Sequence, residues 1–296
     1  MPTALTLGPV TVLASNDHGR YPDGHSLVVR GRDETILIDP SVTLAVAADP
    51  PGGIDRILIS HAHEDHLSGV FRYPQTPIHA HEADLAGVQS LPGLMAVYGL
   101  PADTEPRWAR EVVERFHYVE RPDAVGFRDG DIFDLGGVTI RVIHLPGHTS
   151  GHCGFHIDPG GILFLADIDL SGFGPYYGDR SSSLEAFEET LRRCRDLDAE
   201  HYVTFHHKGV VSGRAAFLTL LADYGAVIGR REERLRDWLV EPRTLDDIVR
   251  HRFIYRPHVT LLFVEGVERR SAELHLERLV ARGEVREVEP GRYQRV

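Results

Sequence analysis

Cysteine and long apolar runs are both scarce in this chain of 296 residues. Its two cysteines, Cys153 and Cys194, are too few for a disulfide framework and are not spaced as zinc ligands. No apolar run approaches the roughly 20 residues that a membrane-spanning helix needs. Residues 1–12 lack a basic flank followed by an apolar block, so we expect no signal peptide. These absences predict a cytoplasmic protein that does not interact with membranes.

Positive charge is scarce in the first two thirds of the chain. Residues 1–206 carry 15 Lys/Arg against 30 Asp/Glu, residues 207–296 carry 17 against 14, and the formal net charge of the chain is −12. An acidic surface does not attract phosphate backbones, which argues against non-specific nucleic-acid binding by the first part. The slightly basic second part leaves such binding open as an alternative.

Short apolar segments separated by turns fill most of the first 206 residues. Strand and helix signals alternate there without a regular βαβ series, which favours a layered α/β sandwich over a barrel. The predicted strands are Thr6–Ala14, Ser26–Arg30, Thr35–Ile38, Ile54–Ser60, Thr139–His144, Gly161–Ala166 and His201–Phe205. The predicted helices are Glu82–Ser90, Ser183–Arg195 and Ala215–Leu239.

The last 70 or so residues differ in character from the rest. Thr244 and the two aspartates after Leu245 predict the start of a helix that runs to Arg252. A second helix is predicted over Ser271–Arg282, ending at Gly283, and a β-hairpin over residues 284–296. This order of helix, helix and hairpin predicts a small winged-helix-like appendage. We therefore divide the chain into domains of residues 1–225 and 226–296.

The strongest chemical signal is His61-x-His63-x-Asp65-His66, which directly follows the predicted strand Ile54–Ser60. Imidazole and carboxylate groups are good ligands for zinc and similar divalent ions. Alternate residues on an extended path point the same way, so His61 and His63 can share one ion. Asp65 and His66 are then turned toward a second ion. The spacing therefore predicts a metal site rather than a histidine-rich surface loop.

This motif resembles the signature of the metallo-β-lactamase superfamily, and later segments follow in the family's order. Pro146-Gly147-His148-Thr149 resembles the turn of glyoxalase II, residues 163–167 resemble the strand that ends in the bridging aspartate, and residues 202–209 replace the final strand and turn. The resemblance covers about residues 5–210 and implies a four-layer αβ/βα sandwich. The segment after Gly229 resembles the winged-helix extension of the β-lactamase-like-protein-2 group.

The resemblance also implies a set of metal ligands. His61, His63 and His148 belong to a first site, Asp65, His66 and His206 to a second, and Asp167 bridges both. It implies two divalent ions, with zinc preferred and manganese or iron as substitutes. Such ions share a hydroxide and polarise the scissile bond. Asp65 is the expected catalytic residue, because it can orient that hydroxide and pass a proton to the leaving group.

The final motif leaves two adjacent histidines open as the second-site ligand. A gap-free alignment selects His206, and His207 is the alternative. Thr204 and Phe205 replace the proline and glycine that are usual in the family's turn, so the loop departs from the family's pattern while an imidazole is retained.

Several other residues are weaker candidates. Tyr176 and Tyr177 lie in a glycine-flanked loop and are predicted either to cover the substrate or to form a surface turn. His79 and His81 form a second alternating pair, interpreted as structural residues rather than a third metal site. Outer contacts to the metal ligands or plain loop positions are predicted for His18, His25, His152 and Asp169.

Three functions fit these motifs. The favoured one is a binuclear hydrolase in which a metal-bridging hydroxide attacks an acyl bond, of a thioester or similar ester, in a small-molecule substrate. The alternatives are a metal-dependent ribonuclease or phosphodiesterase and a mononuclear iron persulfide dioxygenase. Arginines and acidic residues alternate in the tail, which favours ion pairs over a basic RNA-binding face. We therefore predict that the tail shapes the rim of the active site or a homodimer contact.

Overall fold

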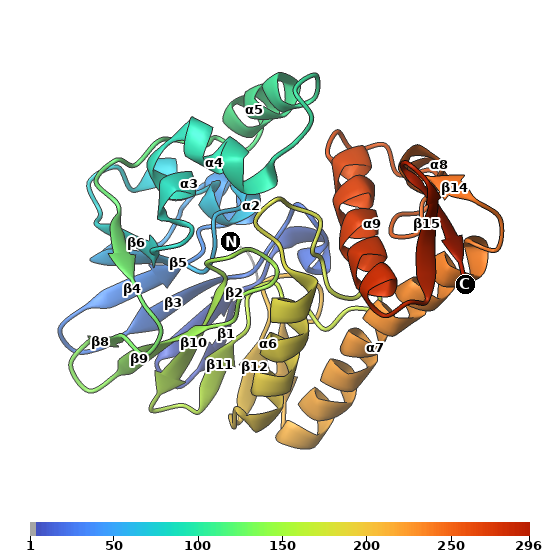
Figure 1. Ribbon diagram of the computed structural model, residues 1–296. Helices are drawn as coiled ribbons and strands as arrows, with labels where there is room; N and C mark the ends of the chain where they lie inside the picture. Colours follow the sequence, from blue (N-terminus) through green and yellow to red (C-terminus); the bar gives the residue numbers. More distant parts are fainter. Residues whose placement is uncertain (1–3) are drawn as a thin grey trace.

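Two mixed β-sheets stack face to face at the centre of the computed structural model, which describes residues 4–296 (Figure 1). The first sheet contains seven strands in chain order: β1 (Ala4–Leu7), β2 (Val10–Leu13), β3 (Ser26–Arg30), β4 (Thr35–Ile38), β5 (Arg56–Ile59), β6 (Ile78–His81) and β7 (Val125–Phe127). The second runs in the order β13 (Val210–Ser212), β12 (His201–Val203), β11 (Ile162–Phe164), β10 (Cys153–Asp158), β9 (Thr139–His144) and β8 (Ile132–Asp134).

Strand periodicity explains why these sheets have two buried faces. Along β3, Leu27 and Val29 lie in the apolar core between the sheets, whereas Val28 points to the opposite face and packs under helices. On β4, Ile38 lies in the core between the sheets, and Leu37 packs under the helices on the opposite face. Successive side chains of a strand point to opposite sides, so a continuous apolar run is what a strand covered on both faces requires.

Helices cover the outer face of each sheet and complete four layers (Figure 1). Over the first sheet lie α3 (Leu85–Gln89), α4 (Leu91–Tyr98) and α5 (Glu105–Glu114), and over the second α6 (Leu184–Asp196) and α7 (Arg214–Trp238). The loops contain α1 (Val42–Ala45), α2 (Glu64–Leu67) and two 3-10 turns, η1 (Asn16–Gly19) and η2 (Val70–Arg72). The αβ/βα sandwich expected from the sequence is confirmed.

The tail consists of α8 (Leu245–His251), α9 (Val264–Ala281) and a three-stranded sheet ordered β14 (Arg243–Thr244), β16 (Arg292–Arg295) and β15 (Val285–Glu289). The predicted boundary between residues 225 and 226 falls inside α7, a continuous helix of 25 residues. Its Phe217 packs under the second sheet, and its Leu235 belongs to the separate apolar core of the tail. The division into two domains and the winged-helix assignment stay predictions.

Most predicted elements differ from the structure by up to three residues at an end, and two differ more. The single strand expected over Thr6–Ala14 is a hairpin, because Gly8 adopts φ +54° and turns β1 back on β2. The helix expected to begin at Ser271 begins at Val264. Val264 and Val267 pack into the apolar core over the first sheet, and this distant contact supports the additional turns. Within residues 4–296, no helix is both long and apolar enough to span a membrane.

Candidate metal centre

The histidine motif lies where β5 ends between the two sheets. A buried carboxylate, Asp39, fixes this turn: its Oδ1 accepts from the Ser60 backbone N–H (2.7 Å) and its Oδ2 accepts from the Ser60 hydroxyl (2.5 Å). The chain then passes through His61 and enters the short helix α2, which contains Asp65 and His66. A strand that ends in a fixed turn thus places four polar side chains at one edge of the sheets.

The first group of potential ligands consists of His61, His63, His148 and Asp167. His61 Nε2 lies 3.0 Å from His63 Nδ1, and His148 Nε2 lies 3.1 Å from both of these atoms. Asp167 Oδ2 approaches His148 Nε2 to 3.3 Å. Four donor atoms from three separate segments therefore surround one point.

The second group consists of Asp65, His66 and His206. His206 Nε2 lies 3.1 Å from Asp65 Oδ2, and His66 Nε2 lies 3.9 Å from Asp65 Oδ1. The other oxygen of Asp167, Oδ1, lies 3.0 Å from His66 Nε2. Asp167 therefore directs one carboxylate oxygen to each group, as a carboxylate shared by two ions would.

The chemistry of this donor set fits divalent cations. Asp65 Oδ2, His66 Nε2 and Asp167 Oδ1 are buried and approach other ligand atoms at ion-pair distance, but they form no well-directed hydrogen bond in the described chain. Such an arrangement costs free energy unless a ligand satisfies these atoms. Burial and neighbouring imidazoles lower the pKa of His61, which favours its neutral, ligating form. Against the effect of burial, neighbouring carboxylates raise the pKa of His63, His66 and His206, so binding of a cation would release protons from these three rings. Although burial opposes ionisation of Asp167, His206 and His66 hold its pKa well below the usual range. Neutral imidazoles and ionised carboxylates are the states that metal binding requires.

Each histidine of the first group is held through its other ring nitrogen. His61 Nδ1 lies 3.1 Å from the Ser60 hydroxyl oxygen, and His148 Nδ1 lies 3.1 Å from the Tyr176 carbonyl oxygen. His63 Nε2 lies 2.7 Å from Asp179 Oδ2. Because these outer nitrogens donate hydrogen bonds, the lone pair of each ring faces the centre of the group.

The second group is oriented in the same way. His66 Nδ1 lies 2.9 Å from Asp39 Oδ2, and His206 Nδ1 lies 2.9 Å from the Asp23 carbonyl oxygen and 3.1 Å from that of Gly19. The whole set is therefore preorganised by contacts outside it, which is typical of functional sites rather than of accidental histidine clusters.

The loop after β12 places His206, and not His207, in the second group. The Thr204 hydroxyl donates to the His206 carbonyl oxygen (2.6 Å) and accepts from the Gly209 backbone (3.0 Å), so it closes the turn. Phe205 stacks on the His66 ring at a centroid distance of 3.6 Å. His207 turns away toward Asp169, 3.7 Å between His207 Nε2 and Asp169 Oδ2, and its side chain is 37% exposed.

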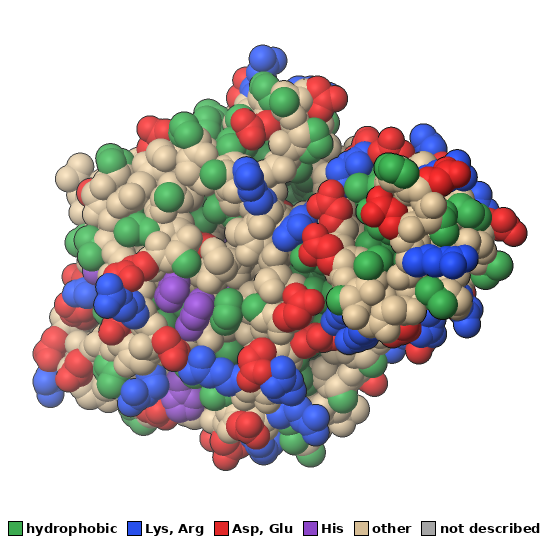
Figure 2. Space-filling model, in the orientation of Figure 1, with side chains coloured by type: hydrophobic (Ala, Val, Ile, Leu, Met, Phe, Trp, Pro, Cys, Tyr) green, Lys and Arg blue, Asp and Glu red, His purple; other side chains and the backbone are tan. Residues whose placement is uncertain are grey.

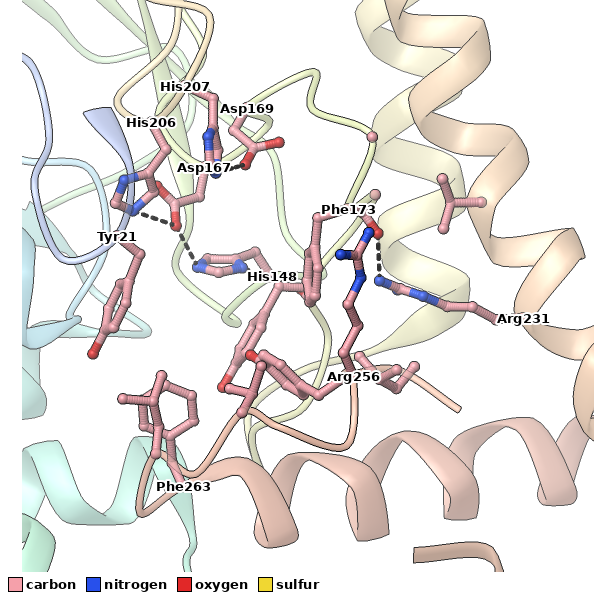
Figure 3. Close-up of a pocket in the computed structure, with 18 of the residues that line it drawn as sticks. Tyr21, His148, Asp167, Asp169, Phe173, His206, His207, Arg231, Arg256 and Phe263 are labelled. Atoms are coloured by element: carbon pink, nitrogen blue, oxygen red, sulfur yellow. Dashed lines mark hydrogen bonds and ion pairs between the residues drawn. The ribbon is translucent and has the colours of Figure 1, made fainter. Parts of the chain in front are cut away.

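Both groups open into a cavity of about 1070 Å³ (Figure 3). One wall comes from the sandwich, including Tyr21, Tyr98 and Trp108, and another from the tail, including Tyr255 and Phe263. Because tail residues form one wall of the cavity, the structure agrees with the prediction that the tail shapes the rim of the site. The dimer alternative stays a prediction.

Of the two tyrosines predicted to cover the substrate, only Tyr176 lines the cavity. Tyr177 was a wrong choice: it is 1% exposed, packs under the second sheet, and its hydroxyl lies 2.9 Å from His275 Nε2 on α9. Consecutive residues in an extended loop point to opposite sides, which explains why one faces the cavity and the other the core.

Sequence reasoning missed Asp179 and Glu64. Asp179 is buried and holds His63 and the Tyr176 hydroxyl, but no local pattern distinguishes it from other loop aspartates. Glu64 is also buried and accepts hydrogen bonds from the hydroxyls of Tyr21 (2.7 Å) and Tyr98. A glutamate inside the histidine motif was a visible signal, but its partners come from distant segments.

The weaker candidates lie around the site rather than in it. His152 Nε2 accepts from the Asp167 backbone N–H (3.2 Å), and His25 Nδ1 accepts from the Ser15 backbone (3.0 Å). His18 is exposed. His79 and His81 lie on β6, outside both groups of potential ligands in the described chain, and His81 stacks on His144 at 4.1 Å.

Comparisons with known proteins agree with this geometry. The model of the family described as "Metallo-beta-lactamase superfamily" matches residues 21–207. Among curated proteins, the chain is similar to a beta-lactamase-like protein 2 homolog of Caenorhabditis elegans, with 24% identity over 67% of this chain and 58% of the relative. A hydroxyacylglutathione hydrolase of Methylococcus capsulatus is 32% identical over 38% of this chain and 42% of its own length. The chain thus spans about half the length of the curated relatives it matches.

Solved structures match over nearly the whole chain, including the tail. A metallo-beta-lactamase family protein from Thermus thermophilus aligns with a TM-score of 0.72 and 23% identity, covering 98% of this chain and 99% of the other. A beta-lactamase domain protein from Burkholderia ambifaria aligns with a TM-score of 0.68 and 19% identity, covering 100% and 95%. At these identities the likeness concerns the fold. Together with the family match over more than half of the sequence and the paired ligand groups, it shows that the chain belongs to the metallo-beta-lactamase superfamily.

Proposed function

We propose that the protein is a binuclear metal-dependent hydrolase that cleaves an acyl bond, of the thioester or ester type, in a small molecule. The observation that carries this proposal is the position of Asp167, whose two oxygens face the two groups of potential ligands. Support also comes from the matched hydroxyacylglutathione hydrolases. The cavity is near the upper end of the roughly 300–1000 Å³ usual for small-molecule sites.

In this proposal the first ion is held by His61, His63 and His148, the second by Asp65, His66 and His206, and Asp167 serves both. When bound, such ions supply the Lewis acidity that polarises an acyl carbonyl and activates water. Asp65 would orient the attacking water and accept its proton. The water oxygen bonds to the acyl carbon, the carbon–sulfur bond breaks, and Asp65 returns the proton to the leaving thiolate.

Screening the metal-loaded protein against thioesters, lactones, phosphodiester substrates and RNA tests this function. We expect thioesters or related esters to be hydrolysed fastest. Phosphodiester or RNA cleavage is the alternative, and the arginines that line the cavity are the observation in its favour. Faster cleavage of RNA than of any ester would overturn the acyl-bond proposal.

Elemental analysis of the purified protein should find two metal ions per chain, with zinc the expected metal and manganese or iron as substitutes. The reason is that two groups of buried donors share one carboxylate. Removal of the metal by a chelator should abolish hydrolysis, and zinc should restore it. Full activity with one iron per chain would instead favour a mononuclear dioxygenase.

The outer carboxylates provide a matched pair of variants. Asp39→Asn should weaken the second ion more than the first, because Asp39 contacts His66 directly and reaches His61 only through Ser60. Asp179→Asn should weaken the first ion, because Asp179 holds His63. Each loss should be about 10–100-fold in metal affinity, the usual effect of removing an outer partner. Competition titration with a chromophoric chelator measures both affinities. Equal weakening of both ions by each variant would contradict the assignment of the two sites.

A further inference from the structure

The arginines of the tail fall into two classes. Those outside the cavity are mostly neutralised by carboxylates within 4.0 Å: Arg236, Arg250, Arg269, Arg270, Arg278, Arg282, Arg292 and Arg295. Four that line the cavity form no ion pair with a carboxylate of residues 4–296: Arg230, Arg231, Arg234 and Arg256. The ion pairs predicted from the interleaved charges of α7 therefore form, but they connect α7 to α9 and the hairpin and leave the four cavity arginines without a carboxylate partner in residues 4–296.

Arg231 is the most unusual of these residues. Its side chain is 1% exposed, and among residues 4–296 its guanidinium donates only to neutral groups, the carbonyl oxygens of Phe173 (2.7 Å) and Pro175. It also lies over the rings of Phe173 (5.0 Å) and Tyr177 (5.3 Å). A buried cation without a counter-ion is costly, and its positive potential extends into the adjoining cavity.

Arg256 lines the cavity close to Arg231, and we call this region the positive end of the cavity. The side chain of Arg256 has no hydrogen-bond or ion-pair partner in the described chain. Figure 3 shows both guanidinium groups on the side of the cavity away from His206 and Asp167, with Phe173 beside them. The loop that bears Arg256 is fixed by the buried carboxylate of Glu268, which accepts from the backbone N–H groups of residues 253, 254 and 255 at 3.1, 3.2 and 2.7 Å. The backbone that leads to Arg256 is therefore held in place, whereas its side chain is exposed and keeps its donors for a ligand.

The acidic residues of the tail do not neutralise this end. Asp237 lines the cavity, but it pairs with Arg295 (3.2 Å). Glu233 also lines it, is exposed, and pairs with none of the four arginines. On the face of the tail seen in Figure 2, basic and acidic side chains are intermixed. Of the four cavity arginines only Arg231 is buried, and the other three are exposed where the cavity opens. Within residues 4–296 this part of the cavity therefore carries positive charge without a carboxylate partner.

Between the two ends the lining is aromatic. Tyr255 lies against Phe173 (5.3 Å between ring centroids) and Phe263 (6.4 Å), and Phe263 contacts Tyr21 (5.8 Å) near the second ligand group. The cavity therefore has a ligand cluster at one end, an apolar middle, and a positive end.

We propose that this positive end binds an anionic group of the substrate, a carboxylate or a phosphate, through Arg256 in the field of Arg231. This second proposal rests on the proposed acyl hydrolysis. It predicts that the substrates are thioesters or esters that carry a negative charge several bonds from the scissile carbonyl. Guanidinium groups suit both anions, because their planar N–H donors match pairs of oxygens.

Calorimetric titration of the zinc-loaded protein with S-hexylglutathione, a thioether that cannot be hydrolysed, tests the proposal. We expect its dimethyl ester to bind about tenfold more weakly or worse, because the ester lacks the carboxylate charges. S-hexyl-coenzyme A supplies phosphates instead, and the thioether that loses more affinity in Arg256→Gln identifies the anion. In that variant the preference for the charged thioether over its ester should largely disappear.

Arg286→Gln is the matched control, since Arg286 is an exposed tail arginine that also lacks an ion pair in the described chain but lies outside the cavity lining. It should retain the full preference. Equal binding of both thioethers and the ester, or an unchanged preference in Arg256→Gln, would overturn the proposal. Tight binding of a short single-stranded RNA that is lost in Arg256→Gln would also overturn it. Because binding needs no turnover, charge preference without thioester hydrolysis would contradict only the proposed function.

Discussion

Asp65→Asn is expected to lower kcat by about 10²–10⁴-fold, the usual contribution of a positioned acid–base group. Asp65 is buried, and its Oδ2 lies at ion-pair distance from His206 Nε2 (3.1 Å) without a well-directed hydrogen bond in the described chain. Asparagine keeps the shape of the side chain but removes its charge and its ability to accept a proton. Steady-state kinetics with a thioester, combined with metal analysis of the same sample, measures both consequences.

Metal at the first site should survive this substitution, because Asp65 belongs to the second group only. Asp169→Asn is the matched control: it makes the same chemical change in the same cavity, at a carboxylate that lies outside both groups. It should reduce turnover less than tenfold, roughly the effect of one weak polar contact. Unchanged kcat in Asp65→Asn would show that another group orients the water.

His206→Ala and His207→Ala should behave very differently although the residues are adjacent. His206 Nε2 lies within 3.8 Å of both Asp65 and Asp167, so its removal should release the second ion and most of the activity. The loss of affinity should exceed the roughly 10–100-fold typical of outer partners, because a direct ligand is removed. His207, whose side chain is 37% exposed and faces Asp169, should tolerate the change with most of both properties intact.

Chelator titration for the second ion and kcat for thioester hydrolysis are the two measurements. If His207→Ala lost the second ion and His206→Ala kept it, His207 would be the ligand, and the assignment along the loop would be wrong by one residue. Loss in both variants would indicate that the turn closed by Thr204 collapses when either ring is removed. Circular dichroism of both proteins separates that outcome from a direct effect on the ligands.

The residues at the ends of the strands are the features that the sequence alone predicts best. The strand ending at Ile59 and the four polar residues beginning at His61 are local features, and the period of two along an extended chain is enough to give them a common direction. Short segments are also enough to predict that the sheets are covered on both faces, because continuous apolar runs such as those in β4 and β5 need burial on both sides.

Local signals failed where the deciding contact comes from elsewhere in the chain. Nothing near Ser271 indicates that α9 begins seven residues earlier, since the support comes from the core over the first sheet. Asp179 contacts His63 across 116 residues, and Tyr177 is removed from the cavity by His275, 98 residues away.

The sequence by itself determined the donor types, their order along the chain and the layered sandwich, because these depend on periodicity and on short segments. Only the tertiary structure decided that the tail forms a wall of the cavity and that Arg231 and Arg256 stay without a carboxylate while most other tail arginines are paired. Charge along a helix gives the number of possible ion pairs. Which of them form depends on the distance between elements that meet only after folding, and those distances are set by packing rather than by sequence spacing.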